Sequence, residues 1–188
     1  LISYIAPAAP ATRRPADGDE PFVRPEIGFT PAWFQVRTEV VFDQRWHGDP
    51  RYRLAGMPLL YEAIAETLGP QGLSEVMTPL SDMDILTGVY GACFVPGLFG
   101  VPIRYSYDGW PECEHKYLSD REAARLEPPN LDACPLFEDL MRQVEEIRTE
   151  LGTVAGYLNW QGVLNTAYRL RGEAIFTDMA TEPERAEH

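Results

Sequence analysis

Two amide side chains, Asn159 and Gln161, lie in a polar loop between an apolar run and a helical pattern. The apolar run covers residues 154–158, and apolar residues then recur at helical spacing over residues 163–170. In barrels built from repeated strand, loop and helix units, polar side chains that follow a strand face the catalytic mouth. Asn159 and Gln161 are therefore predicted to bind a substrate.

A second group with ligand chemistry is formed by Cys113 and His115, which are separated by one residue. Zinc usually takes four protein ligands, or three and a water molecule, so two residues make no closed site. We therefore predict no metal site in this chain. The three cysteines, Cys93, Cys113 and Cys134, are far apart in the sequence, and buried or unreactive thiols are expected.

Two helices are predicted from apolar stripes with clear end signals. The first begins at Asp49-Pro50, where a capping residue precedes a proline at the first helical position, and it stops at Gly69-Pro70. The second begins at Pro135 and ends at Gly152. The stripe of the first helix consists of Leu59, Leu60, Ile64 and Leu68. The stripe of the second consists of Leu136, Phe137, Leu140, Met141, Val144, Ile147 and Leu151.

The remaining segments predict strands, loops and a flexible arm. Residues 101–107 alternate in character as a strand with two different faces does, and residues 108–130 read as a long surface loop. Residues 1–26 are rich in Ala, Pro and charge, which predicts a flexible arm. Strands that alternate with helices, as they do over residues 135–170, are typical of a parallel α/β architecture.

The charge and hydropathy of the chain argue against two classes of partner. The formal net charge is −13, which opposes the broad neutralisation of phosphates that nucleic-acid binding requires. No apolar run approaches the roughly 18 residues that a membrane-spanning helix needs, and residues 1–9 lack the basic start of a signal peptide. We therefore expect a cytoplasmic protein that binds neither nucleic acid nor membrane.

Ordered motifs along the chain resemble the uroporphyrinogen decarboxylase superfamily. The C-terminal set is Gly156-Tyr157, Tyr168 with Gly172, Asp178-Met179 and Pro183-Glu184. The N-terminal set is Thr-Pro-Ala-Trp at 30–33, Asp-Ile-Leu at 84–86 and Leu-Phe-Gly at 98–100. The resemblance covers residues 27–188. It implies an α/β fold, namely the N-terminal part of a (β/α)8 TIM-type barrel with a helical and irregular extension before it. A complete barrel typically needs about 250 residues, so a chain of 188 residues would form a partial barrel.

The resemblance implies two chemistries. The first is decarboxylase-type activity on a tetrapyrrole, a porphyrinogen, without a cofactor. The alternative is a methyltransferase of the same fold that uses zinc and a corrinoid, with a corrinoid protein as partner and its metal ligands outside this chain. A non-catalytic acidic module that binds a partner is a further alternative, and a homo-oligomer is compatible with each of them.

The resemblance also assigns roles to three residues. Asp84 would accept hydrogen bonds from pyrrole N–H groups, and Tyr168 would place its hydroxyl at the substrate. The decarboxylases follow their Trp with a Met-Arg-Gln-Ala-Gly-Arg run whose arginines meet substrate carboxylates, and Arg37 is similar but one position out of register. Because successive strand ends of a barrel converge on one face, Asp84, Asn159, Gln161 and Arg37 are predicted to share one pocket.

Overall fold

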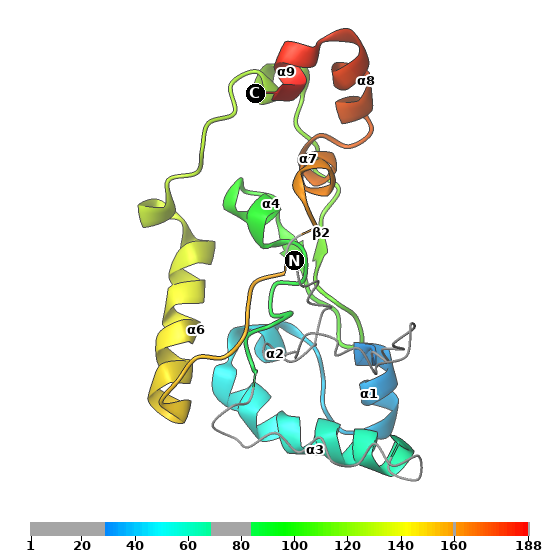
Figure 1. Cartoon of the computed structure of the whole chain (residues 1–188), viewed down its shortest axis with the longest axis vertical. Coiled ribbons are helices and arrows are strands. Elements are labelled where there is room, and N and C mark those ends of the chain that lie inside the picture. Colours follow the sequence, from blue (N-terminus) through cyan, green and yellow to red (C-terminus); the bar gives the residue numbers. More distant parts are fainter. Residues whose placement is uncertain (1–28, 69–83, 160, 188) are drawn as a thin grey trace, which may run out of the picture.

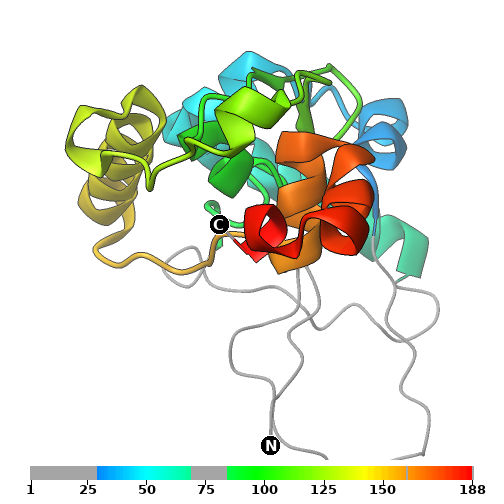
Figure 2. The same cartoon turned by 90° about the horizontal axis from the view of Figure 1, so that it is seen from above.

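The computed structural model describes residues 29–68, 84–159 and 161–187, and most of its regular structure is helical. At one end of the molecule lie α1 (Pro31–Arg37), α2 (Gln44–Gly48) and α3 (Pro50–Leu68). At the other end lie α7 (Val163–Arg171), α8 (Ala174–Thr181) and α9 (Pro183–Glu187) (Figure 1). The helix α6 (Pro135–Leu151) runs along one side, as the view along the long axis also shows (Figure 2).

Short elements join the two ends. They are α4 (Phe94–Leu98), β1 (Ile103–Arg104), β2 (Glu112–Cys113), α5 (Asp120–Ala123) and a single 3-10 turn at Leu131–Ala133. The strands β1 and β2 pair antiparallel, with Ile103 opposite Cys113 and Arg104 opposite Glu112. In the described ranges, this two-stranded sheet is the only sheet.

The ends of the helices follow from capping chemistry. The Asp49 carboxylate accepts hydrogen bonds from the backbone N–H groups of Arg51 and Tyr52, 3.0 and 3.1 Å away, and so satisfies two of the free donors at the start of α3. Helix α6 starts with Pro135 and ends at Gly152, whose φ of 74° is the left-handed conformation that glycine favours. The predicted starts of both long helices and the end of α6 are thus confirmed.

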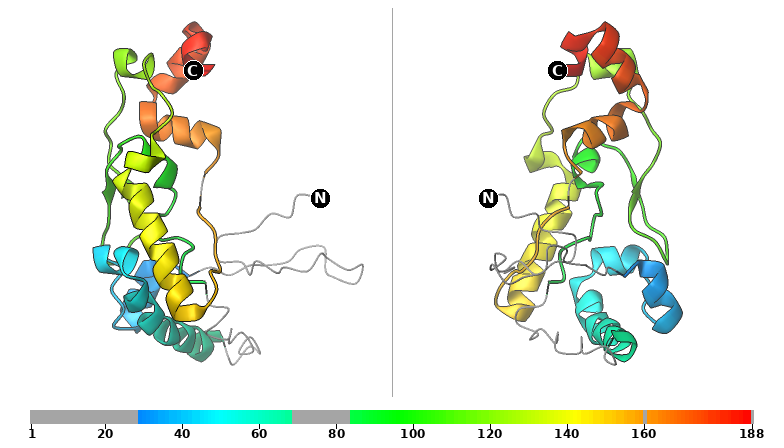
Figure 3. Two further views of the ribbon diagram at one scale, coloured as in Figure 1. Left: turned by 90° about the vertical axis from the view of Figure 1, so that its left-hand side faces the viewer. Right: turned by 45° about the vertical axis from the view of Figure 1, so that its right-hand side comes forward.

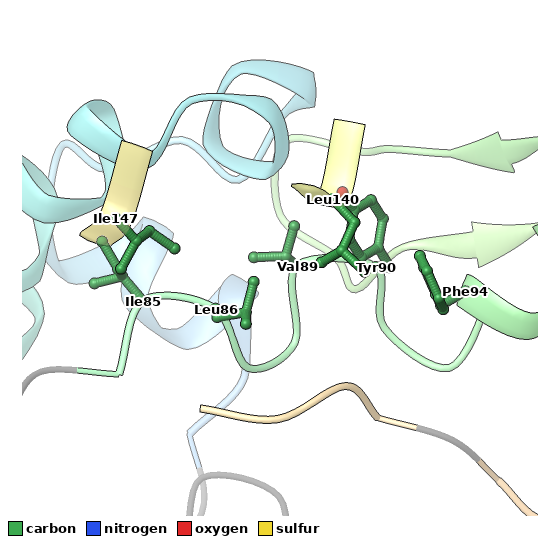
Figure 4. Close-up of a cluster of buried hydrophobic side chains, with 7 residues drawn as sticks. All are labelled: Ile85, Leu86, Val89, Tyr90, Phe94, Leu140 and Ile147. Carbon is green, nitrogen blue, oxygen red and sulfur yellow. The ribbon is translucent and has the colours of Figure 1, made fainter. Parts of the chain in front are cut away.

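The main hydrophobic cluster lies between α6 and the turn at residues 84–94. It joins Ile85, Leu86, Val89, Tyr90 and Phe94 to Leu140 and Ile147 of α6 (Figure 4). Helix α6 also packs against α3 and α4, so the cluster connects the N-terminal helices to the centre of the molecule. A second cluster, built from Val40, Phe42, Trp46 and Leu60, holds the N-terminal helices together.

The apolar stripes are only partly buried. Leu60 of the first predicted stripe is buried, but its neighbour Leu59 is 43% exposed. In α6, Leu140 and Ile147 are buried as predicted, whereas Met141 is 49% exposed and the polar Gln143 is fully buried. Each helix thus turns a narrower apolar face to the core than its sequence indicates.

The predicted partial (β/α)8 TIM-type barrel is wrong. Such a barrel needs parallel strands joined by helices, but the sheet in the described residues has two short antiparallel strands. Residues 154–158, predicted as a strand, belong to no strand of the sheet found in the described ranges and run extended past α6 towards α7 (Figure 3). Of the predicted strand at 101–107, only Ile103–Arg104 pairs, and the predicted loop at 108–130 contains β2 and α5. The predicted arm, residues 1–26, lies outside the described residues.

Candidate functional site

A pocket lies between α7 and the chain that leaves β2. Its volume is about 240 Å³. From the β2 side its lining residues are Cys113, Glu114, His115 and Tyr117, and from the α7 side they are Gln161, Asn165, Tyr168 and Arg169. On α7, Asn165 and Arg169 are about one helical turn apart, which places them on one face of the helix, and Gln161 lies just before the N-cap Gly162.

The two walls of the pocket are tied together by backbone and ion-pair contacts. The Leu118 N–H donates to the Leu170 carbonyl, 2.8 Å away. The Arg171 guanidinium donates from Nη1 to the Leu118 carbonyl at 2.6 Å and from Nε to Asp178 at 2.8 Å, and it also pairs with Asp120. Hydrogen bonds from Arg171 lower the pKa of Asp178, so this anchor stays ionised at neutral pH. These contacts fix the position of one wall of the pocket relative to the other.

A row of rings crosses the pocket. The ring centroids of His115 and Tyr117 are 5.8 Å apart, those of Tyr117 and Tyr168 are 6.5 Å apart, and those of Tyr168 and Phe176 are 6.0 Å apart. These spacings lie in the range of interacting aromatic pairs. Tyr117, Tyr168 and Phe176 are 42%, 37% and 51% exposed, so the row presents apolar surface and hydroxyl groups to a ligand.

One cation is oriented in the pocket. Arg169 donates from Nε and Nη2 to the Gln161 side-chain oxygen, at 3.3 and 3.1 Å. Within the described part of the chain, no other hydrogen-bond partner of this guanidinium is seen, so part of its five-donor fork remains available. Arg169 can therefore bind a carboxylate while Gln161 fixes its orientation.

The structure brings together only two of the predicted site residues, Gln161 and Tyr168, which line this pocket. Asn159 is half-buried in the connection that precedes α7 and does not line it. Arg37 belongs to α1, where its guanidinium stacks 4.2 Å above the Trp33 ring, at the other end of the molecule (Figure 1). The predicted single pocket for Asp84, Asn159, Gln161 and Arg37 is therefore not formed.

Asp84 stabilises the turn in which it lies. Its carboxylate accepts hydrogen bonds from the backbone N–H groups of Leu86 and Thr87 at 3.0 and 2.8 Å, and from the Thr87 hydroxyl. The turn contacts the Gly156-Tyr157 segment, because the Tyr157 N–H donates to the Thr87 hydroxyl at 3.0 Å. A Cβ on Gly156 would lie 2.5 Å from the Asp84 carboxylate, so glycine permits this approach. Two motifs of the resemblance thus meet here, away from the pocket.

Sequence reasoning missed Arg169, Asn165, His115 and Tyr117. The signal for the first two was present, since Asn165 and Arg169 are four residues apart in the predicted helix and so share a helix face. His115 was noted only as a partner of Cys113 for metal binding. Its Nδ1 lies 2.7 Å from the Tyr117 hydroxyl instead.

The described residues contain no group of three or more His, Cys, Asp or Glu side chains that could hold a metal ion. The zinc and corrinoid of the methyltransferase alternative were expected on residues outside this chain, so that alternative stays a prediction. None of the helices over the described ranges has the length and hydropathy to cross a bilayer.

Comparison of the chain with family models, with curated proteins and with solved structures found no match.

Proposed function

We propose that the pocket between β2 and α7 binds a carboxylated edge of a tetrapyrrole, the substrate class of the superfamily that the sequence resembles. The observation that carries the proposal is the combination of an oriented guanidinium, Arg169, with a row of rings beside it. A ligand that combines apolar pyrrole rings with acidic side chains needs both features, namely an apolar platform and a local cation.

The size of the pocket fits one part of such a ligand. Pockets that enclose a whole small molecule commonly measure about 300–1,000 Å³, and this pocket measures about 240 Å³. One pyrrole ring with its acidic side chain would enter, and the other rings would lie along the exposed Tyr168 and Phe176. The resemblance implies that the reaction is decarboxylation of a porphyrinogen. In this pocket Arg169 would hold the bound carboxyl group.

The net charge of −13 makes the local cation essential. A tetrapyrrole with several carboxylates is repelled by the protein as a whole, so its affinity depends on charge-assisted hydrogen bonds at short range. Arg169 supplies them.

The first prediction is a loss of porphyrin binding in Arg169→Gln. Coproporphyrin, titrated into the protein and followed by its absorbance and fluorescence, should bind the wild type. The variant should bind about 10- to 100-fold more weakly, because a hydrogen bond to a charged group contributes about 1.5–3 kcal/mol.

Two matched variants control for the loss of a positive charge. Arg148→Gln removes an exposed arginine of α6 that pairs with Glu145, and Arg37→Gln removes the arginine that sequence reasoning chose. Both should bind coproporphyrin as the wild type does. No binding by the wild type, or an Arg37→Gln defect as large as that of Arg169→Gln, would overturn the proposal. Incubation with uroporphyrinogen then separates a decarboxylase, which releases products with fewer carboxyl groups, from a binding module, which releases none.

A further inference from the structure

Two of the three cysteines meet behind the pocket. Cys93 directly precedes α4, and Cys113 belongs to β2, and both lie in one hydrophobic cluster with Val101 and Leu170. Cys93 is fully buried and Cys113 is 8% exposed. The third cysteine, Cys134, lies at the start of α6 and is not part of this cluster.

The segments that carry the two thiols run side by side. A Cβ on Gly91 would lie 3.0 Å from the Pro111 carbonyl oxygen, and the Cys93 thiol donates a hydrogen bond to the same oxygen at 3.4 Å. Both cysteines pack in the same cluster, and the proximity of Cys113 contributes to the raised pKa of Cys93. The fold therefore brings the two thiols into one cluster, although 19 residues separate them in the sequence.

The pocket gives one of the two thiols a route to small reagents. Cys113 lines the pocket together with Glu114 and His115, whereas Cys93 is not among its lining residues. A reagent as small as a hydroperoxide can enter a space of about 240 Å³, while the fold shields Cys93 behind Cys113.

We propose that Cys93 and Cys113 are an oxidation site that forms an intramolecular disulfide when hydrogen peroxide enters the pocket. The Cys113 sulfur attacks one peroxide oxygen, the O–O bond breaks, and a sulfenic acid and one water form. The Cys93 thiol then attacks the sulfenic sulfur, so that the S–S bond forms and the S–O bond breaks with release of a second water. Two thiols and one hydrogen peroxide thus give one disulfide and two waters.

The surroundings of the two thiols give them different roles in this reaction. Burial raises the pKa of Cys93 to about 12, and the proximity of Cys113 adds to the rise. Cys93 therefore stays a protonated thiol at neutral pH and is a poor first nucleophile. Cys113 reacts first because it is the thiol that the pocket exposes, and Cys93 resolves the sulfenic acid that lies beside it.

Mass spectrometry after mild oxidation tests the proposal on the full chain. The protein is treated with hydrogen peroxide, unfolded in guanidinium and labelled with N-ethylmaleimide, so that every remaining thiol is counted. The reduced protein should take up three labels, one for each cysteine. The oxidised protein should take up one, at Cys134, and peptide mapping without reductant should link Cys93 to Cys113.

Two variants keep the test decisive. Cys134→Ser should form the same cross-link, because Cys134 lies outside the cluster, and Cys93→Ser should accumulate sulfenic or sulfinic acid at Cys113.

The oxidised wild type should also melt several degrees higher than the reduced protein, since the cross-link restricts the unfolded chain. Three labels after oxidation, or a cross-link that includes Cys134, would overturn the proposal. Porphyrin binding by the reduced protein is a separate measurement, so either proposal can fail without the other.

Discussion

Buried polar side chains hold the middle of the molecule through one hydrogen-bonded network. Arg53 of α3 donates to the carbonyl oxygens of Ile85 and Trp46, each at 2.7 Å, and to the Gln143 side-chain oxygen at 2.6 Å. The Gln143 amide in turn donates to the Tyr90 hydroxyl and to Asp139. Arg53 and Gln143 look like surface residues in the sequence. Their burial depends on partners up to 96 residues away, which local patterns do not reveal.

His47 is the residue of this region whose titration has the clearest consequence. It is 2% exposed, and its Nδ1 lies 2.7 Å from the Val89 carbonyl, so the ring donates from Nδ1. Its Nε2 is buried without a hydrogen-bond partner among the described residues. Burial, helped by the nearby Arg53 charge, lowers the pKa of His47 from 6.5 to about 4. A proton on Nε2 would therefore be buried without an acceptor.

The second prediction is an acid-sensitive contribution to stability. The unfolded chain protonates His47 near pH 6.5, whereas the folded protein does so near pH 4. The free energy of unfolding should thus be full above pH 6.5 and fall as the pH drops towards 4, by up to about 3 kcal/mol. Denaturant unfolding of the wild type and of His47→Gln at pH 7 and pH 4.5 measures the difference. Equal losses in both proteins would show that His47 does not cause the acid sensitivity.

Among the secondary-structure elements, the two long helices were predicted from the sequence, whereas the predicted strands were mostly not formed. Helix α6 was predicted to the residue at both ends, because proline at its start and glycine at its end act locally. A strand exists only if a partner pairs with it. Residues 154–158 read as a strand, yet Val154 and Leu158 pack against the main cluster and belong to no strand of the sheet found in the described ranges. An apolar run predicts that the side chains are buried, but it does not show whether the backbone pairs with another strand.

The third prediction compares two glycines that end helices. Gly172 closes α7 with φ 67° and ψ −151°, and a Cβ there would lie 2.8 Å from the Tyr117 ring. Gly152 closes α6 with φ 74°, and its Cβ would meet nothing within 4 Å. Gly152→Ala should therefore cost about 1 kcal/mol of backbone strain, and Gly172→Ala about 2–3 kcal/mol, because its conformation is close to a region that glycine alone adopts readily.

The two variants should also differ in function. Gly172→Ala pushes the Tyr117 ring, which lines the pocket, and should weaken coproporphyrin binding, whereas Gly152→Ala should leave binding unchanged. Thermal unfolding and porphyrin titration of both variants provide the measurements. Weaker binding in Gly152→Ala, or equal affinities in both variants, would contradict the placement of the ligand beside Tyr117.

At the scale of the whole molecule, the arrangement of helices decides which residues share a site. Sequence reasoning assumed that strand ends converge on one face, and so grouped Asp84, Asn159, Gln161 and Arg37. In the structure Arg37 lies on α1 and Gln161 precedes α7, and these two helices lie well apart along the long axis (Figure 3). Only one wall of the pocket, the helix face of α7, could be predicted from the sequence. Its other wall is a connection whose approach to α7 depends on Arg171 and Leu118.

Hydrogen exchange with and without coproporphyrin tests the central claim most directly, because it locates the ligand on the whole chain. The account predicts slower exchange of backbone amides over residues 113–118 and 161–172, which form the two walls of the pocket, and unchanged exchange over residues 31–37 and 84–87. Protection of residues 31–37 and 84–87 with no change at the pocket would contradict it and would favour a site built around Arg37 and Asp84.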